Sequence, residues 1–448
     1  MAFVITQLRR AFLACALFLW VRSGDAAGLL SDGSEARSAG IGGTEAAQSG
    51  SALAAMDSNP AALTSIDGSS LELNWGGAFL RGRFSRDTGE NAGLEMDSAL
   101  LPAAAFTLAP PRGFPVTFGV AIIPEVTAGA DWRYRDALGG LGGTTTYGDQ
   151  TNRSTIVALR SQLGVGVEVT HWLSVGASGG VAYDHNSLHA PYIFQSQRVL
   201  AGFKTLLDLE ADGFAPSFDF GAQVHPSSRL TLGASYRPSS TIETTGHASG
   251  NASAQLQALG GGFAQAEPNF HYDAEVRTVL PQVVSTGAEW QALDWLRLVD
   301  GIDWVNWSRA FDQLEIRLTR GSNSDINAVV GADSMTDVAP LRWRDQFVYR
   351  AGMEFALPGG FTARTGYSYA RSAVPLETLT PLTAAIFEHK LAAGIGYRTG
   401  RYHADLAWQW SLPVTQHVEC SALLSDEYSR TSVRVSGQSL QLSTGIAF

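Results

Sequence analysis

The sequence predicts an all-β protein, a 14-stranded antiparallel transmembrane β-barrel with a small luminal plug at its N-terminus. Three observations predict this fold: an export signal, apolar residues at alternate positions of many segments, and connections that alternate regularly between short turns and long loops. The composition agrees, with 48 glycines in 448 residues, 16% charged residues and a mean hydropathy of +0.01. Such weak hydropathy is typical of a barrel, because only alternate residues of each strand face lipid.

The chain begins with features of a secretory signal. Arg9 and Arg10 precede an apolar run at 11–21, and small residues at 24–26 offer a cleavage site. The run is too short for a comfortable membrane span, and no apolar run of about 18 residues follows it. Residues 1–26 are therefore predicted to be a signal peptide.

Charge and cysteine content exclude several classes of protein. The full chain has a formal net charge of −11, and the mature chain is more acidic because the signal carries three arginines and one aspartate. Nucleic-acid binding needs clustered positive charge, so no nucleic-acid partner is expected. Only Cys420 remains after cleavage, which excludes an intramolecular disulfide. Metal motifs of the His-Glu-x-x-His or Cys-x-x-Cys kind do not occur, and no cofactor or metal is predicted.

Period-two alternation is the main signal for strands. It is clear in LGVGVEV at 163–169, FVYRAGMEF at 347–355, RYHADLAWQW at 401–410 and the last nine residues of the chain. Large apolar residues occupy one face and small or polar residues the other. Soluble β-sandwiches also alternate in this way, so strand length and loop rhythm have to decide between the two folds.

The rhythm of the connections favours the barrel. Along the sequence, short connections near residues 110, 171, 227, 293, 358 and 400 alternate strictly with longer ones. This pattern predicts turns on one side of a membrane and loops on the other, with both termini on the periplasmic turn side. The predicted strands are 71–86, 93–108, 114–134, 154–170, 173–185, 214–225, 229–245, 273–291, 294–318, 343–357, 360–371, 387–398, 401–412 and 433–448.

Aromatic residues are placed as a membrane barrel requires. Tryptophans gather towards predicted strand ends, where interfacial girdles belong. The chain also ends on an aromatic residue in an alternating strand, which resembles the recognition signal of outer-membrane barrels. The tryptophans predicted to form girdles are Trp132, Trp172, Trp290, Trp295, Trp304, Trp343 and Trp408.

Residues 27–70 precede the first strand and lack alternation. They are rich in small residues, contain apolar anchors such as Leu53 and Met56, and close with the turn Asn59-Pro60-Ala61. A barrel of about 14 strands has a lumen wide enough to need filling. We predict a luminal plug here rather than a disordered tail, with the barrel proper at 71–448.

At this point the sequence resembles a known family. The stretch GSEARSAGIGGTEAAQSGSALAAMDSNPAAL at 33–63 resembles the hatch of FadL-type outer-membrane transporters, which ends in Asn-Pro-Ala. The resemblance covers nearly the whole mature chain, including segments similar to the family's Tyr-Arg strand pair at 209–239, its Trp-Ser strand at 301–316 and its hairpin at 343–375. One departure is Ala-Ala-Ile-Phe at 384–387, where the family often has Asp-Thr-Asp-Arg. The resemblance implies a monomer in the outer membrane that takes up long-chain fatty acids or aromatic hydrocarbons.

Pro124 interrupts the third predicted strand, with Gly129 five residues further on. Proline has no N–H to donate to the ladder, and a closed barrel offers no free edge, so a local break in pairing is expected. The family resemblance implies a lateral gate, in which a kinked third strand opens a gap beside the hatch. The simpler alternative is a bulge near the end of a strand.

The long connection near residue 200 is apolar. Its spacing predicts an amphipathic helix that captures hydrophobic ligand or covers the barrel mouth. Arg198 and Lys204 either meet a ligand carboxylate or belong to a solvated face. The residues of this hydrophobic capture loop are Phe194, Val199, Leu200, Phe203, Leu206 and Leu207.

Together these features predict a passive outer-membrane channel, not an enzyme. It would capture hydrophobic small molecules at its loops and release them sideways towards outer-membrane lipid. The alternatives are an outer-membrane lipid hydrolase and a porin for polar solutes. The G-x-S-x-G match at 176–180 lies in a predicted strand without a following helix, so no nucleophile elbow and no catalytic residue are predicted. A polar-solute porin should lack the plug.

Overall fold

The computed structural model describes residues 33–94, 98–108 and 115–448. The predicted signal peptide, the start of the predicted plug and the predicted short turn near residue 110 lie outside these residues. Within the described ranges, no helix is long and apolar enough to cross a membrane.

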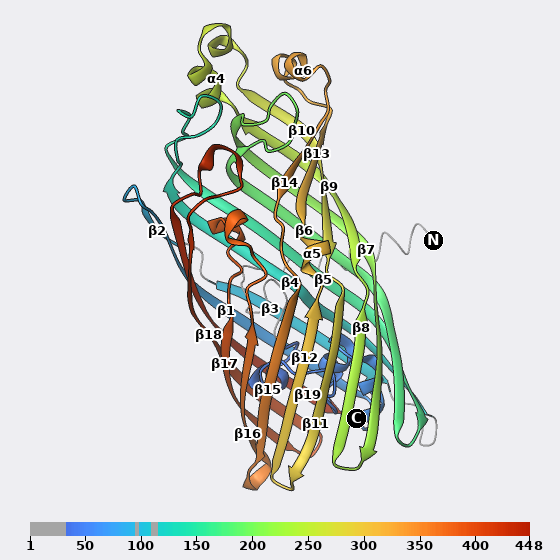
Figure 1. The fold of residues 1–448 in the computed structure, drawn as a ribbon. Coiled ribbons are helices and arrows are strands. Elements are labelled where there is room, and N and C mark those ends of the chain that lie inside the picture. The colour runs from blue at the N-terminus through green and yellow to red at the C-terminus, as the bar shows by residue number, and fades with distance from the viewer. Residues whose placement is uncertain (1–32, 95–97, 109–114) are drawn as a thin grey trace, which may run out of the picture.

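The described strands form one closed antiparallel sheet (Figure 1). Of its 19 segments, β2 is a short spur, and eight others join end to end as four interrupted strands (β8/β9, β10/β11, β12/β13 and β14/β15). The wall therefore has 14 strands, which confirms the predicted fold class. The first and last strands close it, with paired residues from Ser70↔Ala447 to Arg86↔Thr431.

The strand segments are β1 (Ser70–Arg86), β2 (Asn91–Gly93), β3 (Ser98–Leu108), β4 (Val116–Arg135), β5 (Asp149–Thr170), β6 (Leu173–Ile193), β7 (Lys204–Ser227), β8 (Leu230–Arg237), β9 (Ser240–Asn251), β10 (Asn269–Leu280), β11 (Val283–Leu293), β12 (Leu296–Val305), β13 (Gln313–Thr319), β14 (Met335–Pro340), β15 (Gln346–Ala356), β16 (Phe361–Ala370), β17 (His389–Thr399), β18 (Tyr402–Val418) and β19 (Thr431–Ala447). The helices are α2 (Ala36–Gly40), α3 (Ala52–Asp57), α4 (Ser253–Leu259), α5 (Trp307–Ala310) and α6 (Ser324–Val330), with 3₁₀ turns η1 (Pro60–Ser65), η2 (Gly261–Gln265), η3 (Pro358–Gly360), η4 (Leu376–Thr378), η5 (Pro381–Thr383) and η6 (Leu424–Asp426).

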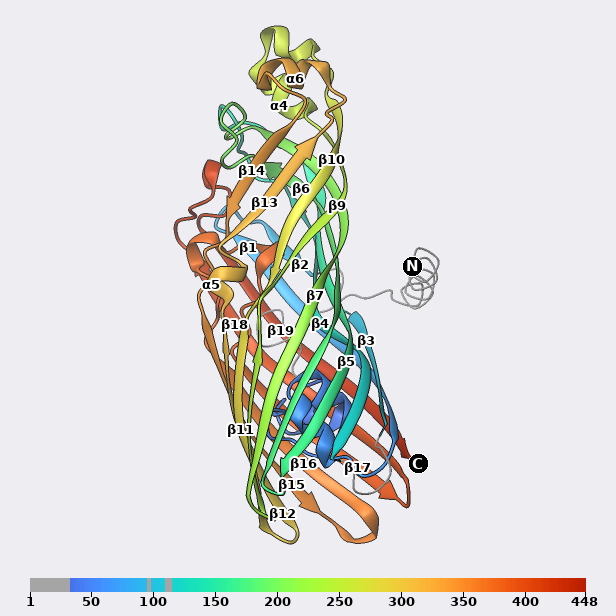
Figure 2. The same ribbon diagram turned by 90° about the vertical axis from the view of Figure 1, so that its right-hand side faces the viewer.

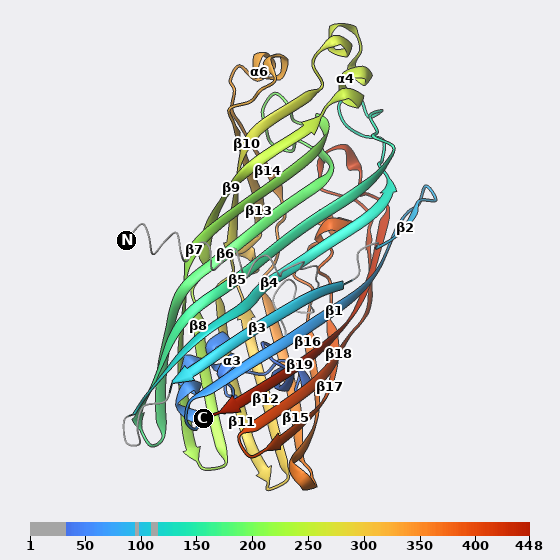
Figure 3. The same cartoon turned by 180° about the vertical axis from the view of Figure 1, so that it is seen from behind.

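The two ends of the barrel differ. One end, called the turn end below, carries the short connections and the C-terminus (Figure 1). The other, the loop end, carries the long connections with α4 and α6, and several strands extend towards it beyond the rest of the wall (Figure 3). The exterior between the ends bears large exposed apolar side chains at alternate positions, among them Trp75, Phe118, Leu163, Phe218 and Leu442. This surface suits contact with lipid.

Most of the predicted girdle tryptophans lie on the exterior, but two do not. Trp172, Trp290, Trp295 and Trp408 are exposed, whereas Trp132 and Trp343 are only 1% and 3% exposed and point into the lumen. The girdle prediction was wrong for these two, and for Trp132 the reason is a bulge in β4.

The bulge reverses which residues of β4 face the lumen. Pro124 pairs with Leu159 and Val126 pairs with Ala158, so Glu125 is an extra residue without a partner on β5. Because side chains alternate along a strand, one extra residue moves every later side chain to the other face. Trp132 therefore faces inward, although the alternation counted from the start of the strand places it outside.

The strands on either side of the predicted capture loop are longer than the sequence suggested. They were expected at 173–185 and 214–225, but β6 and β7 stay paired as far as Ile193↔Lys204. The predicted amphipathic helix is therefore wrong, because Leu206 and Leu207 lie in a strand. A short apolar run fits periods of both 3.6 and 2, and the cross-strand partners decide between them.

The hatch, residues 33–66, lies inside the barrel near its turn end (Figure 2). It contacts the wall closely at strand glycines. An added Cβ would lie 2.3 Å from the Pro60 carbonyl carbon at Gly176, 2.2 Å from the Gly42 nitrogen at Gly366 and 1.9 Å from the side-chain Oδ1 of Asn59 at Gly221. The small residues on the inner faces of these strands thus leave room for the plug. A side chain at any of these positions would push the hatch off the wall.

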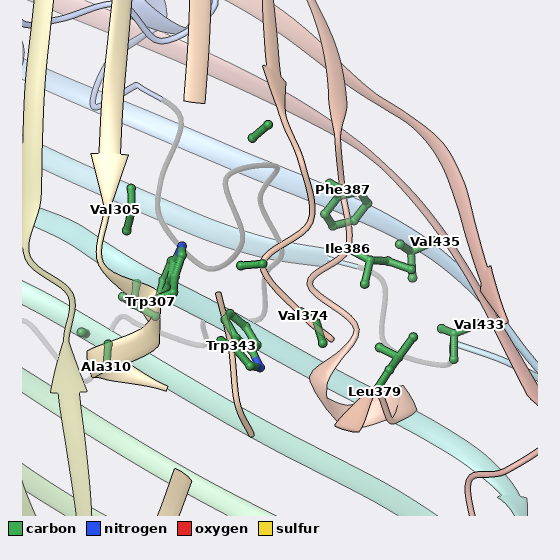
Figure 4. Close-up of a cluster of buried hydrophobic side chains, with 14 of the residues drawn as sticks. Val305, Trp307, Ala310, Trp343, Val374, Leu379, Ile386, Phe387, Val433 and Val435 are labelled. Carbon is green, nitrogen blue, oxygen red and sulfur yellow. The ribbon is translucent and has the colours of Figure 1, made fainter. Parts of the chain in front are cut away.

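Towards the loop end, the connection between β16 and β17 folds back into the lumen. Val374, Leu379, Ile386 and Phe387 of this connection are buried against side chains from the wall and from α5 (Figure 4). The lumen is therefore polar and plugged near the turn end and apolar above the hatch.

We expect single cysteines to report the topology. In a Cys420→Ser background, Ser227→Cys and Thr399→Cys at the turn end should resist a membrane-impermeant maleimide in intact cells. Thr144→Cys and Gly262→Cys at the loop end should react, because the turn end is expected to face the periplasm. Reaction of all four in permeabilised cells is the control. Labelling of the turn-end pair in intact cells would contradict this orientation.

Candidate functional site

An apolar cavity of about 160 Å³ lies in the lumen above the hatch. It lies between β1, β4, β5, β13 and β19 and the inward-folded connection between β16 and β17, and Arg81 is the one charged residue among the described residues that line it. The lining residues are Leu80, Arg81, Leu94, Gly129, Ala130, Trp132, Ser154, Ile156, Phe311, Leu314, Leu341, Trp343, Pro381, Leu382, Thr383, Ala384, Ala385, Phe387 and Val435.

Aromatic rings fix the shape of this cavity. Trp343 stacks on Phe311 with ring centroids 4.9 Å apart, and Trp307 packs edge-on against both (Figure 4). Trp132 Nε1 donates to the Pro381 carbonyl at 3.1 Å, which ties the wall to the inward connection. Trp343 Nε1 is buried and has no hydrogen-bond partner among the described residues.

The wall beside the cavity is incomplete. Strands β3 and β4 pair from Leu108↔Phe118 to Ala104↔Ile122 and then separate, although β4 stays paired with β5 on its other side. The chain before β3 meets β4 again at the isolated bridge Leu94↔Trp132, which bounds the interruption. Continuing the same register would place Pro102 opposite Pro124, and neither residue has an N–H to donate. Gly129 of β4 lines the cavity just beyond this point. The predicted break at Pro124 is therefore present, and Pro102 is a second contributor that the sequence prediction missed.

The bulged residue is held by a buried ion cluster. Glu125 lies 3.0 Å from Arg160 Nε and 3.4 Å from Arg237 Nη1. The same guanidinium groups bind Asp219 at 2.8 and 2.6 Å, and both contact Asp57 at the end of α3. Two arginines thus join the bulge of β4, the wall strand β7 and the hatch.

Asn59 fastens the hatch two residues beyond Asp57. Its Nδ2 donates to the Ala46 carbonyl at 2.6 Å within the hatch and to the Ala222 carbonyl of the wall at 3.1 Å. Its Oδ1 accepts from Ala61 N–H at 3.1 Å and so caps η1, which begins at Pro60. The predicted hatch residues therefore lie together, fully buried against β7 and β8.

The predicted capture residues separate into two groups. Phe194, Leu200, Phe203 and Leu207 are buried in an apolar cluster inside the loop end, with residues of β9, β10, β13 and β14. Val199 is 47% exposed and Leu206 lies on the other face of its strand. The connection itself is a tight turn, held by Asp337, which accepts from the backbone N–H groups of residues 195–197 at 2.7 to 3.1 Å.

Lys204 is not a solvated charge. It is fully buried, lies 2.7 Å from Asp136 Oδ1, pairs with Glu427 and donates to the Ala137 carbonyl at 2.8 Å. These contacts, called the loop clasp below, join three connections at the loop end. A ligand carboxylate would have to displace two protein carboxylates to reach Lys204, whereas Arg198 is exposed.

Ser178 of the G-x-S-x-G match lies within β6 and donates to Asp219 Oδ2 at 3.1 Å. Its hydroxyl is thus part of the polar surroundings of the ion cluster, and the strand–turn–helix of a nucleophile elbow is not formed there.

A hatch-filled barrel with an apolar cavity and an incomplete wall defines a class: outer-membrane channels for hydrophobic compounds. Residues 25–446 match the model of the family described as outer membrane protein transport protein (OMPP1/FadL/TodX). The chain belongs to this family. Comparison with curated protein sequences gave no match.

Solved structures share the fold at low sequence identity. A Pseudomonas aeruginosa FadL homologue is similar with a TM-score of 0.73 at 16% identity, over 94% of this chain and 100% of that one. The Pseudomonas putida toluene transporter TodX gives 0.72 at 18%, over 94% and 100%. The Ralstonia pickettii toluene transporter TbuX gives 0.70 at 20%, over 93% and 99%.

The ion cluster predicts a large effect for one arginine. Arg160→Gln would leave three buried carboxylates facing a single guanidinium, and breaking such a buried network typically costs about 3–5 kcal/mol. We expect a clear drop in the thermal unfolding midpoint of the purified protein. The control is Arg229→Gln, whose side chain is 55% exposed and pairs with Asp294, which is 89% exposed. Its cost should stay below about 1 kcal/mol. Equal midpoints for the two variants would contradict a structural role for the cluster.

The loop clasp should be more stable in acid. Burial raises the pKa of Glu427 from 4.5 to about 7, and burial also raises the pKa of Asp136. The closed clasp binds protons more tightly than the opened loops, so its stability should fall as pH rises from about 4.5 to about 7. Hydrogen-exchange protection factors at 136–148 and 419–430 should decline over this range. Glu427→Gln should flatten the decline, and protection that rises with pH would contradict the assignment.

Proposed function

We propose that this chain is a passive channel for compact, uncharged hydrophobic molecules. They enter from the loop end, occupy the apolar cavity and leave sideways between β3 and β4 into the outer membrane. The observation that carries the proposal is the end of β3–β4 pairing at Ala104↔Ile122, directly beside the cavity. The turn end and both termini face the periplasm in this proposal, and one chain forms the whole path.

The size and lining of the cavity support compact substrates. A dry apolar cavity of about 150 Å³ accommodates a benzene ring, and the cavity above the hatch has about 160 Å³. Burying the ligand surface contributes roughly 25 cal/mol per Å², which favours entry without an energy source. An extended fatty acid would need much more space than the cavity offers.

Charge supports the same choice. The buried cations Arg160, Arg237 and Lys204 already contact two or three protein carboxylates each. A ligand carboxylate entering the lumen would compete with these groups and lose its hydration. Arg81 lines the cavity, but its exposed side chain belongs to the outer face of β1.

A sideways exit is supported by what blocks the direct route. The hatch fills the lumen below the cavity, and buried ion pairs join it to the wall, such as Arg37 to Glu354 at 2.6 Å. Movement of the whole plug would break several such contacts together. The wall opening needs no such movement, because the two strands are already separate there.

Restoring the missing backbone donors tests the exit. We expect Pro124→Val to slow uptake of labelled toluene in cells lacking other routes, and Pro102→Val/Pro124→Val to slow it further, because both valines can pair across the opening. The control is Pro216→Val on β7, which pairs with Val181 far from the opening. Toluene uptake should exceed oleate uptake in the wild type. Wild-type rates for the double variant at normal surface abundance would contradict lateral release, and faster oleate uptake would contradict the substrate class.

A further inference from the structure

A groove on the outside of the barrel is lined by arginines. It crosses β1, β18 and β19, has a volume of about 720 Å³ and lies on the wall seen in Figure 3. Its lining includes Phe79, Arg81, Arg83, Trp410, Pro413 and Arg434. A bulge between Ser411 and Val414 of β18 interrupts the regular wall beside it.

The strand register brings two of the arginines face to face. Arg83 is directly opposite Arg434 on the neighbouring strand, and Arg81 is opposite Ser436. All three arginine side chains are exposed on the outer face. Like charges directly opposite one another on a sheet are destabilising, so this arrangement favours an anion between them.

Carboxylates of the described residues do not resolve this repulsion. Among the described residues, no aspartate or glutamate lies within 4 Å of the Arg81, Arg83 or Arg434 guanidinium groups. Some other exposed arginines have such partners, for example Arg153 with Asp131 at 2.8 Å, whereas others such as Arg277 have none among the described residues. What distinguishes the groove is that three exposed arginines gather there and that two of them lie directly opposite each other, an arrangement that suits an external anion.

The groove lies at the level of lipid headgroups. On β1 the exposed apolar residues run from the turn end through Trp75 to Phe79, and on β19 Leu440 and Leu442 continue the same belt. Arg81 follows Phe79 by two residues, or roughly 7 Å along the strand towards the loop end. The acyl chains of a lipid can therefore cover the belt while its headgroup meets the arginines.

We propose that this groove binds the phosphorylated headgroup of a glycolipid of the outer leaflet, the lipid A part of lipopolysaccharide. Guanidinium groups form paired hydrogen bonds with phosphate oxygens, and two phosphates could engage three arginines. Phe79 and Trp410 would contact the sugar and the upper acyl chains. This assignment rests on the proposed orientation, which places the loop end at the cell surface.

The site borders the proposed exit. Arg81 lines both this groove and the luminal cavity, so the bound lipid would lie next to the opening between β3 and β4. A fixed glycolipid at this place would keep the opening in contact with acyl chains rather than with loosely packed lipid.

Lipid that stays bound through purification provides the test. Protein extracted in mild detergent should carry about one lipid A per barrel by native mass spectrometry, and Arg81→Gln/Arg83→Gln/Arg434→Gln should carry at least tenfold less. The matched control is Arg153→Gln/Arg317→Gln/Arg342→Gln, which removes three exposed arginines that have carboxylate partners. The control should retain the lipid. Equal retention by both triple variants, or no lipid A on the wild type, would overturn the proposal.

A second measurement does not depend on how the triple variant folds. Lipid A added to delipidated wild-type protein should raise its thermal unfolding midpoint, whereas dephosphorylated lipid A should not. Arg434→Gln, which removes only the face-to-face charge, should weaken the rise. An equal rise with both lipids would show that acyl chains alone bind and would overturn the proposal. Toluene uptake into vesicles without lipopolysaccharide should match between wild type and Arg83→Gln/Arg434→Gln, whose residues do not line the luminal cavity, so failure here and failure of the channel function are distinguishable.

Discussion

The bulge at Glu125 is the constraint on which the luminal site depends. It turns Trp132 into the lumen, and it follows directly on Pro124, where β3 and β4 have separated. Its carboxylate is fixed by Arg160 and Arg237, which also hold the hatch. Buried ion clusters of this kind contribute little net stability because desolvation offsets their attraction. The physical role we infer for the cluster is to fix one geometry of bulge, wall and plug.

The hatch fits the wall because the wall has glycines where the two meet, as well as because their charged groups pair. Strand glycines at 176 and 366 let the hatch backbone, and the one at 221 lets the Asn59 side chain, approach the wall so closely that no Cβ would fit. Glycine weakens a strand, because it costs conformational entropy and offers no packing. The hatch contacts offset this loss, since Asn59 replaces side-chain packing with hydrogen bonds to wall carbonyls. Plug and barrel therefore stabilise each other.

At the loop end, one connection folds into the lumen and buried polar groups hold its neighbours in place. The connection between β16 and β17 supplies one side of the cavity, and buried polar groups such as Lys204 and Asp337 hold the neighbouring connections. These groups are paired within the protein, so the mouth is closed by specific contacts rather than by loose loops. In the proposed function, a hydrophobic ligand passes between apolar side chains, and this would favour small uncharged molecules over charged ones.

Local pattern in the sequence determined the number of strands, the alternation of turns and loops, and the position of the plug, because these depend on neighbouring residues. It also located Asn59-Pro60-Ala61 and the break at Pro124. Only the tertiary structure decided that Trp132 and Trp343 face the lumen, that Lys204 is buried, and that residues 204–207 form a strand. Each of these depends on contacts between separate strands or connections, which the pattern within one segment does not specify. The same holds for the position of Pro102 opposite Pro124, because the residue pattern of one strand does not specify which residue of the neighbouring strand it pairs with.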